Sequence, residues 1–230
     1  MEFKKLVINS QIDLNILSSK KNYIITKAKY GPSKETKIPL NINKDLAFFT
    51  AAIIGDGHLK KSKKQISIEL SNKKLLEYLR KICITSFNRT FNICSIKQRE
   101  GKKPSWHMSI DSKSIHNFLN QALEIPIGKK SHKVIIPKII KKANKETKKA
   151  FLQGIMATEG GKRRRGYGLS TASKKLWEEL ILLFEELNIP TQKDKWIYKK
   201  YKKEYYGLTF KKDCYNYLMR RCRSGQTGCV

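Results

Sequence analysis

The chain has 230 residues, 40% of them hydrophobic, which is enough to bury the core of one domain or of two fused small ones. Its 49 Lys and Arg against 19 Asp and Glu give a formal charge of +30 at pH 7, which predicts a polyanionic partner, with nucleic acid as the leading class. No apolar run reaches the roughly 18 residues of a bilayer-spanning helix, and five cysteines without a Cys-x-x-Cys pair argue against a structural zinc or a disulfide framework. Because the first residues lack a signal-peptide apolar segment, we expect an intracellular protein with no membrane partner, in the cytoplasm (nucleoid) or in an organelle matrix.

Residues 1–40 form an N-terminal extension whose role the sequence does not indicate. The stretches KKLVINS (4–10) and NYIITKAKY (22–30) alternate apolar with polar residues, a pattern typical of short strands. The pair Gly31-Pro32 then marks a turn.

The first predicted helix covers LAFFTAAIIGDG (46–57), and Asn43 is a suitable N-cap for it. Small residues recur every four positions at Ala47, Ala51 and Gly55. Residues four apart share a helix face, so these three form a narrow stripe along which another backbone can approach closely.

A lysine-rich connector follows at about 124–149. Pro126, Gly128 and Pro137 interrupt any helix there, and the many lysines predict contact with phosphate.

A second apolar helix is predicted over AFLQGIMATEGG (150–161), and Asn144 is its candidate N-cap. Ala150, Gly154 and Thr158 repeat the small-residue stripe. Like the first helix, this segment ends on an acid followed by glycine.

Two further matches follow these helices in the same order, which indicates an internal duplication. The matching pairs are SIELSNKKLLEYLRKI (67–82) with LSTASKKLWEELILLF (169–184), and SWHMSIDSKSIHNFL (105–119) with EYYGLTFKKDCYNYL (204–218). Each repeat, 41–123 and 150–230, is therefore predicted to run helix, strand, strand, helix, strand, strand, helix, an α+β fold.

If the two stripes face each other, Asp56 and Glu159 emerge together at the ends of the paired helices. Two adjacent carboxylates repel unless a cation lies between them, and oxygen ligands without Cys or His suit Mg²⁺. A hard cation beside a basic surface predicts hydrolysis of phosphodiesters. The simpler interpretation is that Gly57 and Gly160 are ordinary C-terminal helix caps.

The pair TAAIIGDG (50–57) and LQGIMATEG (152–160) resembles the two copies of the LAGLIDADG motif in single-chain, pseudo-dimeric homing endonucleases. The resemblance covers about 45–218. It implies an αββαββα repeat with pseudo-twofold symmetry, two saddle-like antiparallel sheets on one long DNA site, and double-strand cleavage across the minor groove by a monomer.

The resemblance also implies roles for single residues around the two motifs. Asp56 and Glu159 take the metal-binding acid positions, and the carbonyls of Gly55 and Thr158 stand where the family also ligates metal. Ala157 replaces a motif residue that is not a ligand.

Four lysines match basic positions near the family's active site: Lys162 close to the second motif, Lys74 and Lys175 before each second helix, and Lys130 as a central lysine. At the positions where relatives often place Gln or Asn to hold the attacking water, this chain has Leu70 and Thr171.

The predicted strands KQISIEL (64–70), CSIKQR (94–99) and WHMSI (106–110) alternate, so one face should be buried and the other should face DNA. In the second of them, Cys94 and Ile96 are expected to be buried. Outward polar residues can bond to base edges, while lysines mostly neutralise phosphates. The predicted DNA-facing residues are Lys63, Gln65, Ser67, Glu69, Ser95, Lys97, Arg99, His107, Ser109, Arg163, Arg164, Arg165, Lys193 and Lys195.

These patterns favour a site-specific DNA endonuclease that makes a Mg²⁺-dependent double-strand break in double-stranded DNA, in intron or mobile-element homing. The alternative is a non-cutting protein of the same fold, acting as a maturase on intron RNA or as a DNA-binding regulator. A generic RNA-binding protein would explain the charge but not the duplicated acid-ended helices. The chain ends lack intein splicing residues, so a free-standing, intron-encoded protein is expected.

Overall fold

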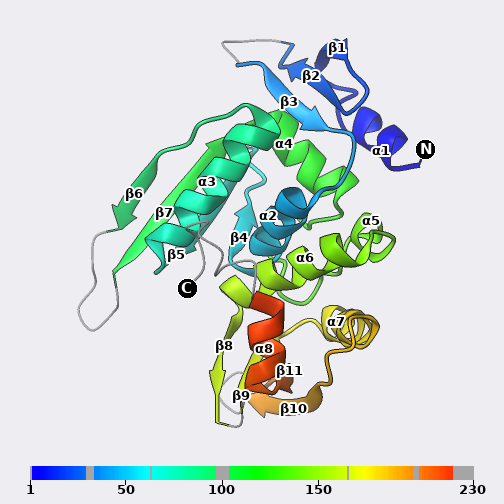
Figure 1. Cartoon of the computed structure of the whole chain (residues 1–230). Helices are drawn as coiled ribbons and strands as arrows, with labels where there is room; N and C mark the ends of the chain where they lie inside the picture. The colour runs from blue at the N-terminus through cyan, green and yellow to red at the C-terminus, as the bar shows by residue number, and fades with distance from the viewer. Residues whose placement is uncertain are drawn as a thin grey trace.

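A computed structural model describes residues 2–29, 34–62, 64–96, 104–164, 166–198 and 202–219 (Figure 1). The first repeat contains α2 (Lys44–Gly55), β4 (Gly57–Leu59), β5 (Gln65–Leu70), α3 (Lys73–Phe87), β6 (Ile93–Ile96), β7 (Ser105–Asp111), α4 (Lys113–Asn117) and a π-helical turn, η1 (Phe118–Ala122). The second contains α6 (Lys145–Thr158), β8 (Gly160–Arg163), β9 (Gly166–Thr171), α7 (Lys174–Glu186), β10 (Gln192–Tyr198), β11 (Lys203–Phe210) and α8 (Lys212–Met219). Between them lies the short α5 (Lys138–Lys141).

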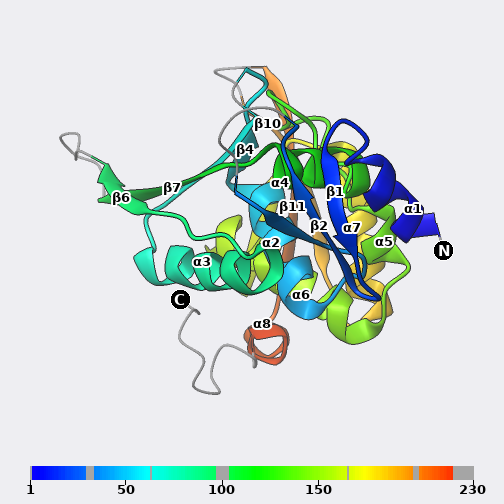
Figure 2. The ribbon, with the colours of Figure 1, turned by 90° about the horizontal axis from the view of Figure 1, so that it is seen from above.

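The two repeats form sheets of the same design, which confirms the predicted duplicated αββαββα fold. Both sheets have four antiparallel strands, in the orders β4-β5-β7-β6 and β8-β9-β11-β10. Seen from above, α3 and α8 lie on one side of the molecule and β4, β6, β7 and β10 on the other (Figure 2). Each sheet therefore has one face covered by helices and one that we call its open face.

Helices α2 and α6 pack side by side between the sheets (Figure 1). A Cβ added at Gly154 would lie 2.5 Å from the carbonyl oxygen of Phe48 and 2.7 Å from the Cβ of Ala51, and one at Gly55 would overlap the side chain of Thr158. The small-residue stripes therefore face each other, as the four-residue spacing predicts.

The two helices also begin together. The Asn43 side chain accepts a hydrogen bond from Leu46 N at 2.8 Å, and Asn144 accepts one from Thr147 N at 2.9 Å. An exposed ion pair of 3.0 Å joins Lys44 at the start of α2 to Glu146 at the start of α6. Because their first turns are adjacent, the two helices deliver their last residues to the same end.

Gly57 and Gly160 are not the left-handed caps that the simpler interpretation requires. Asp56 and Glu159 end the helices in right-handed conformation, and among the described glycines only Gly128 and Gly166 have positive φ. A Cβ at Gly57 would lie 2.6 Å from the Cα of Ile53, so this glycine permits the first strand to turn back tightly against its helix.

The N-terminal extension forms α1 (Glu2–Asn9) and a three-stranded antiparallel sheet in the order β1 (Asn15–Ser19), β2 (Tyr23–Lys27), β3 (Thr36–Pro39). The strand prediction for KKLVINS was wrong, because this segment lies in and just after α1. The short alternation in this segment suggested a strand, but tertiary contacts hold it as a helix. Val7 is buried, and Phe3 packs edge-on against Phe118. NYIITKAKY contains β2 as expected, and the Gly31-Pro32 turn lies outside the described residues.

The extension is tied to the first repeat through Ser114 in α4. Gln11 Nε2 donates to the Ser114 carbonyl oxygen at 3.1 Å, and Thr26 Oγ1 donates to Ser114 Oγ at 2.9 Å. None of the described helices is long and apolar enough to cross a membrane.

The helix pair supplies a stability test. Gly154→Ala should lower the free energy of unfolding by about 1–3 kcal/mol, because the new methyl group overlaps the α2 backbone, although Ala is the better helix former. Urea denaturation measures the change. Gly161→Ala is the matched control, since a Cβ there meets nothing within 4 Å. Equal effects at both positions would show that α2 and α6 do not approach this closely.

Candidate active site and nucleic-acid interface

Asp56 and Glu159 occupy equivalent places at the ends of the paired helices. The Asp56 amide donates to the Ala52 carbonyl oxygen at 3.1 Å, and the Glu159 amide donates to the Ile155 carbonyl oxygen at 2.8 Å. Partial burial raises the pKa of both carboxyls, and the charge of Asp56 raises the pKa of Glu159 further. Both also lie at helix C-termini, where the helix dipole disfavours negative charge. The pair is therefore a strong attractor for a cation.

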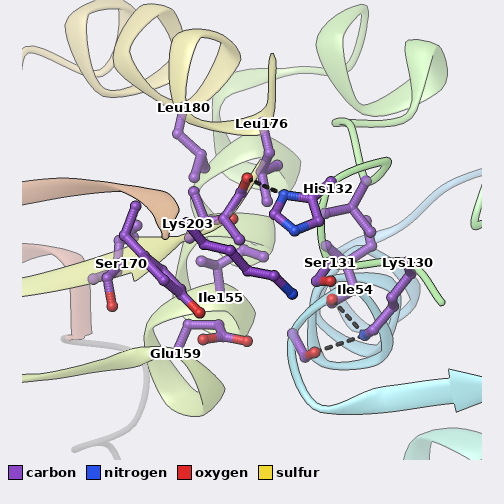
Figure 3. Close-up of a pocket in the computed structure, with 16 residues that line it drawn as sticks. Ile54, Lys130, Ser131, His132, Ile155, Glu159, Ser170, Leu176, Leu180 and Lys203 are labelled. Carbon is purple, nitrogen blue, oxygen red and sulfur yellow. Dashed lines mark hydrogen bonds between the residues drawn. The ribbon is translucent and has the colours of Figure 1, made fainter. Parts of the chain in front are cut away.

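Lys130 from the connector supplies a positive charge that acts on both carboxyls, and Figure 3 shows its ammonium at the end of α2. Its ammonium donates to the carbonyl oxygens of Ile53 at 2.6 Å, Ile54 at 2.5 Å and Gly55 at 2.6 Å, and so caps α2. Burial lowers the pKa of Lys130 to about 8, although Glu159 and Asp56 act to raise it. The predicted central lysine thus lies at the site, and it bonds the Gly55 carbonyl that was predicted to bind metal.

A cavity of about 280 Å³ opens beside Glu159, on the side of the second repeat. Its lining includes Lys130, His132, Thr171 and Lys203. The His132 ring bonds the Ala172 carbonyl oxygen through Nδ1 at 2.9 Å, and Figure 3 shows Lys203 reaching toward the space between His132 and Glu159. Neither His132 nor Lys203 was among the predicted site residues. Only the pairing of β11 with β9 brings Lys203 here.

The other predicted catalytic lysines are not part of the lining of this cavity. Lys74 and Lys175 are exposed in the first turns of α3 and α7, and Lys162 is exposed on β8; none of them lines the cavity. Of the two water-holding positions, Leu70 is buried and Thr171 lines the cavity.

The open face of the first sheet carries part of the predicted DNA-facing set. Gln65, Glu69, His107 and Ser109 share this face, since Glu69 pairs with His107 and the others follow in alternation. Ser67 lies on the same face, as predicted, and is only 9% exposed because strands pair with β5 on both sides of it.

The orientation predicted for β6 was wrong by one residue. Cys94 pairs with His107 and is exposed on the open face, whereas Ser95 pairs with Trp106 and shares the helix-covered side. Residues directly opposite in a sheet share a face, so the partner strand fixes the phase of a short edge strand that its own sequence leaves open.

Lys193 and Lys195 also face the other way from the prediction. They pair with Leu208 and Tyr206, whose side chains are buried against the helix layer. Lys193 accordingly reaches Glu185 of α7 at 3.4 Å.

The open face of the second sheet carries Arg163 and a group of aromatic side chains instead. Arg163 donates to Ser170 Oγ at 3.3 Å on this face, and Arg164 is exposed in the turn after β8. Trp196 and Tyr205 pair across β10 and β11 on the same face. The remaining predicted DNA-facing residues lie outside the described residues: Lys63, Lys97, Arg99 and Arg165.

The model of the LAGLIDADG-like domain family matches residues 146–223, from the first turn of α6 to beyond α8. Residues 146–223 of the chain belong to the LAGLIDADG-like domain family. The acid-ended helix α6 falls within the matched residues, and α2 repeats it in the first half of the chain.

Solved structures show the same fold over both repeats of this chain. A complex of the homing endonuclease I-DmoI with DNA and Mn is 18% identical with a TM-score of 0.56, covering 80% of this chain and 98% of that one. The homing endonuclease I-WcaI bound to its DNA recognition sequence is 17% identical with a TM-score of 0.53, covering 81% and 85%. The N-terminal LAGLIDADG domain of WhiA is 13% identical with a TM-score of 0.50, covering 94% and 86%.

One curated sequence match comes from a much longer protein. The replication factor C small subunit of Methanocaldococcus jannaschii is 30% identical over 166 residues, which are 72% of this chain but 9% of that protein.

The electrostatic contact of Lys130 can be tested directly. Lys130→Met should raise the pKa of both Asp56 and Glu159, because the charge of Lys130 lowers each of them in the wild type. A pH titration of side-chain carboxyl ¹³C shifts measures this in metal-free protein. Lys129→Met, at the neighbouring exposed lysine, is the control and should change neither pKa. If the pKa values of Asp56 and Glu159 are also unchanged in Lys130→Met, Lys130 does not act on the two acids.

Proposed function

We propose that the chain is a site-specific endonuclease that makes a metal-dependent double-strand break in a long site of double-stranded DNA. The observation that carries this proposal is the meeting of two acids, one from each repeat, between two open antiparallel sheets in a chain of charge +30. Each sheet would contact one half of the site, and the acids would lie over the centre.

The donor set at the helix ends fits a hard divalent cation, and we propose Mg²⁺. Asp56 and Glu159 would hold it, with the Thr158 carbonyl as a further oxygen donor. Among the described residues, no group of three or more His, Cys, Asp and Glu side chains gathers at the acid pair or elsewhere, so backbone carbonyls would complete the protein ligands. When bound, the cation would polarise the phosphoryl oxygen and lower the pKa of water.

The protein groups around the acids would orient the phosphate backbone. Lys130 holds the end of α2 and places a positive charge next to both carboxylates. Lys203 and His132 line the cavity beside Glu159, where one strand's phosphate would enter. Because one chain supplies both acids and both sheets, a monomer would suffice for double-strand cleavage. The protein would act in the nucleoid or in an organelle matrix, where target DNA is present.

The second candidate is a non-cutting protein of the same fold that binds DNA or intron RNA. Two observations favour it. Leu70 is buried where relatives place a polar water-holding residue, and the Gly55 carbonyl is occupied by Lys130. The likeness to the WhiA domain shows the fold alone.

Cleavage decides between the two candidates. The target is first selected from a randomised DNA library and cloned into a plasmid. Asp56→Asn and Glu159→Gln should each slow Mg²⁺-dependent linearisation by roughly 100-fold or more, because each removes a metal-binding charge. Both variants should keep their affinity for the target in EDTA. A wild type that binds its selected site but leaves it uncut at any Mg²⁺ concentration supports the non-cutting candidate.

Duplex binding should depend steeply on salt. If six to ten phosphates are neutralised, the logarithm of the binding constant should fall with the logarithm of salt concentration at a slope of roughly −5 to −9. Fluorescence anisotropy over a salt series measures the slope. Glu159→Gln serves as a comparison in which the lysines and arginines of the surface are unchanged. A binding constant that does not change with salt concentration in either protein would refute the role of these basic residues in binding phosphate.

A further inference from the structure

The open face of the second sheet carries three aromatic rings, of which Tyr205 also lines the cavity beside Glu159 and the other two lie outside its lining. Trp196 on β10 pairs with Tyr205 on β11, and their ring centroids are 6.1 Å apart with the planes inclined by only 17°. Tyr198, two residues along β10, meets Tyr205 edge-on at 6.4 Å. We call Trp196, Tyr198 and Tyr205 the aromatic cluster.

A glycine beneath the indole sets the position of the cluster on the sheet. A Cβ at Gly207 would lie 2.9 Å from Cζ3 of Trp196, so the six-membered ring leans across this glycine and onto the strand. Trp196 nevertheless stays 39% exposed and Tyr198 48% exposed. Ring surface is therefore held in a fixed orientation at the solvent boundary.

Positive charge flanks the cluster on the same face. Lys203 lies two residues before Tyr205 on β11, and Arg163 bonds Ser170 on the far side of β9. By contrast Tyr206, the neighbour of Tyr205, points to the opposite face and packs with Trp177 of α7. Rings and cations together are the combination that binds nucleobases and their phosphates.

The first sheet has no counterpart to this cluster. Its open face is tied together by polar pairs: Gln65 donates to Asp111 at 2.7 Å, and Ser105 donates to Glu69 at 2.9 Å. Where the structure describes it, this face has no Phe, Tyr or Trp. The shared fold thus does not require the aromatic cluster, which belongs to the second repeat alone.

We infer that the aromatic cluster is a platform on which unpaired bases of single-stranded nucleic acid stack. In a duplex the faces of each base are covered by its neighbours, and a protein reaches only base edges through the grooves. An exposed, oriented ring face is useful to a base that is unpaired, and open four-stranded sheets with aromatic residues bind single-stranded RNA in this way. This activity goes beyond duplex cleavage and does not depend on it.

The test compares a single strand with a duplex. Fluorescein-labelled oligothymidine and oligouridine of about 16 nucleotides, and a mixed-sequence duplex of the same length, are titrated in EDTA at about 0.2 M salt, where phosphate attraction is weakened. Trp196→Ala should weaken binding of the single strands roughly tenfold or more, and Tyr205→Ala similarly, and each loss should be at least about threefold larger than the loss of duplex binding by the same variant. Trp196→Phe should restore most of the loss, because it keeps a ring.

Tyr217→Ala is the matched control, since Tyr217 is 42% exposed but lies on α8, under the ammonium of Lys149. It should leave single-strand binding unchanged. Equal losses for single strand and duplex would assign the cluster to duplex recognition instead. No single-strand binding by the wild type, or an equal loss in the control, would also overturn the platform. The plasmid cleavage assay uses none of these oligonucleotides. A failure of the proposed endonuclease function can therefore be told apart from a failure of the stacking platform.

Discussion

The close approach of the α2 and α6 backbones is the constraint on which the rest of the structure depends. Gly154 lies against the Phe48 carbonyl, and Gly55 lies against Thr158, so any larger side chain along these stripes would force the helices apart. Both helices start at asparagine caps joined by the Lys44–Glu146 ion pair. With starts aligned and sides in contact, their last residues must emerge together, and this places the acids of the two repeats at one point.

That placement is electrostatically costly, and the surroundings show how the cost is offset. Two carboxylates at helix C-terminal ends face each other's charge and the negative ends of two helix dipoles. Lys130 offsets part of this by bonding three carbonyls of α2 while lowering the pKa of both acids. The loss of solvation leaves Lys130 itself with a pKa of about 8. In the proposed function, this balance would let the site accept a cation and a phosphate.

The two repeats share a backbone but differ in the chemistry of their open faces. The first presents hydrogen-bonding side chains such as Gln65 and His107, and the second presents Arg163 and the aromatic cluster. The cavity containing Lys203 and His132 lies on the side of the second repeat. Duplication therefore gave the protein one symmetric scaffold and two open faces of different chemistry.

Several features could be predicted from the sequence because each rests on local periodicity or on a pattern that occurs twice. They are the duplication, the order of helices and strands, the helix caps and the pair of acids. Small residues spaced four apart lie on one face of a helix, wherever that helix is placed in the fold. The small residues around Ala51 and Gly154 therefore predicted that α2 and α6 pack against each other.

Only the tertiary structure could decide which way an edge strand faces and which distant groups reach the acids. The four residues of β6 are too few to show which face each side chain takes, and their pairing with β7 placed Cys94 on the open face. Pairing with β11 placed Lys193 on the helix-covered side of its sheet. The first segment of the extension forms helix α1 because Val7 is buried and Phe3 packs against the core. The local sequence pattern does not indicate these long-range contacts. Lys203 and His132 meet Glu159 only through long-range folding, whereas the acids themselves were fixed by the helices that end on them.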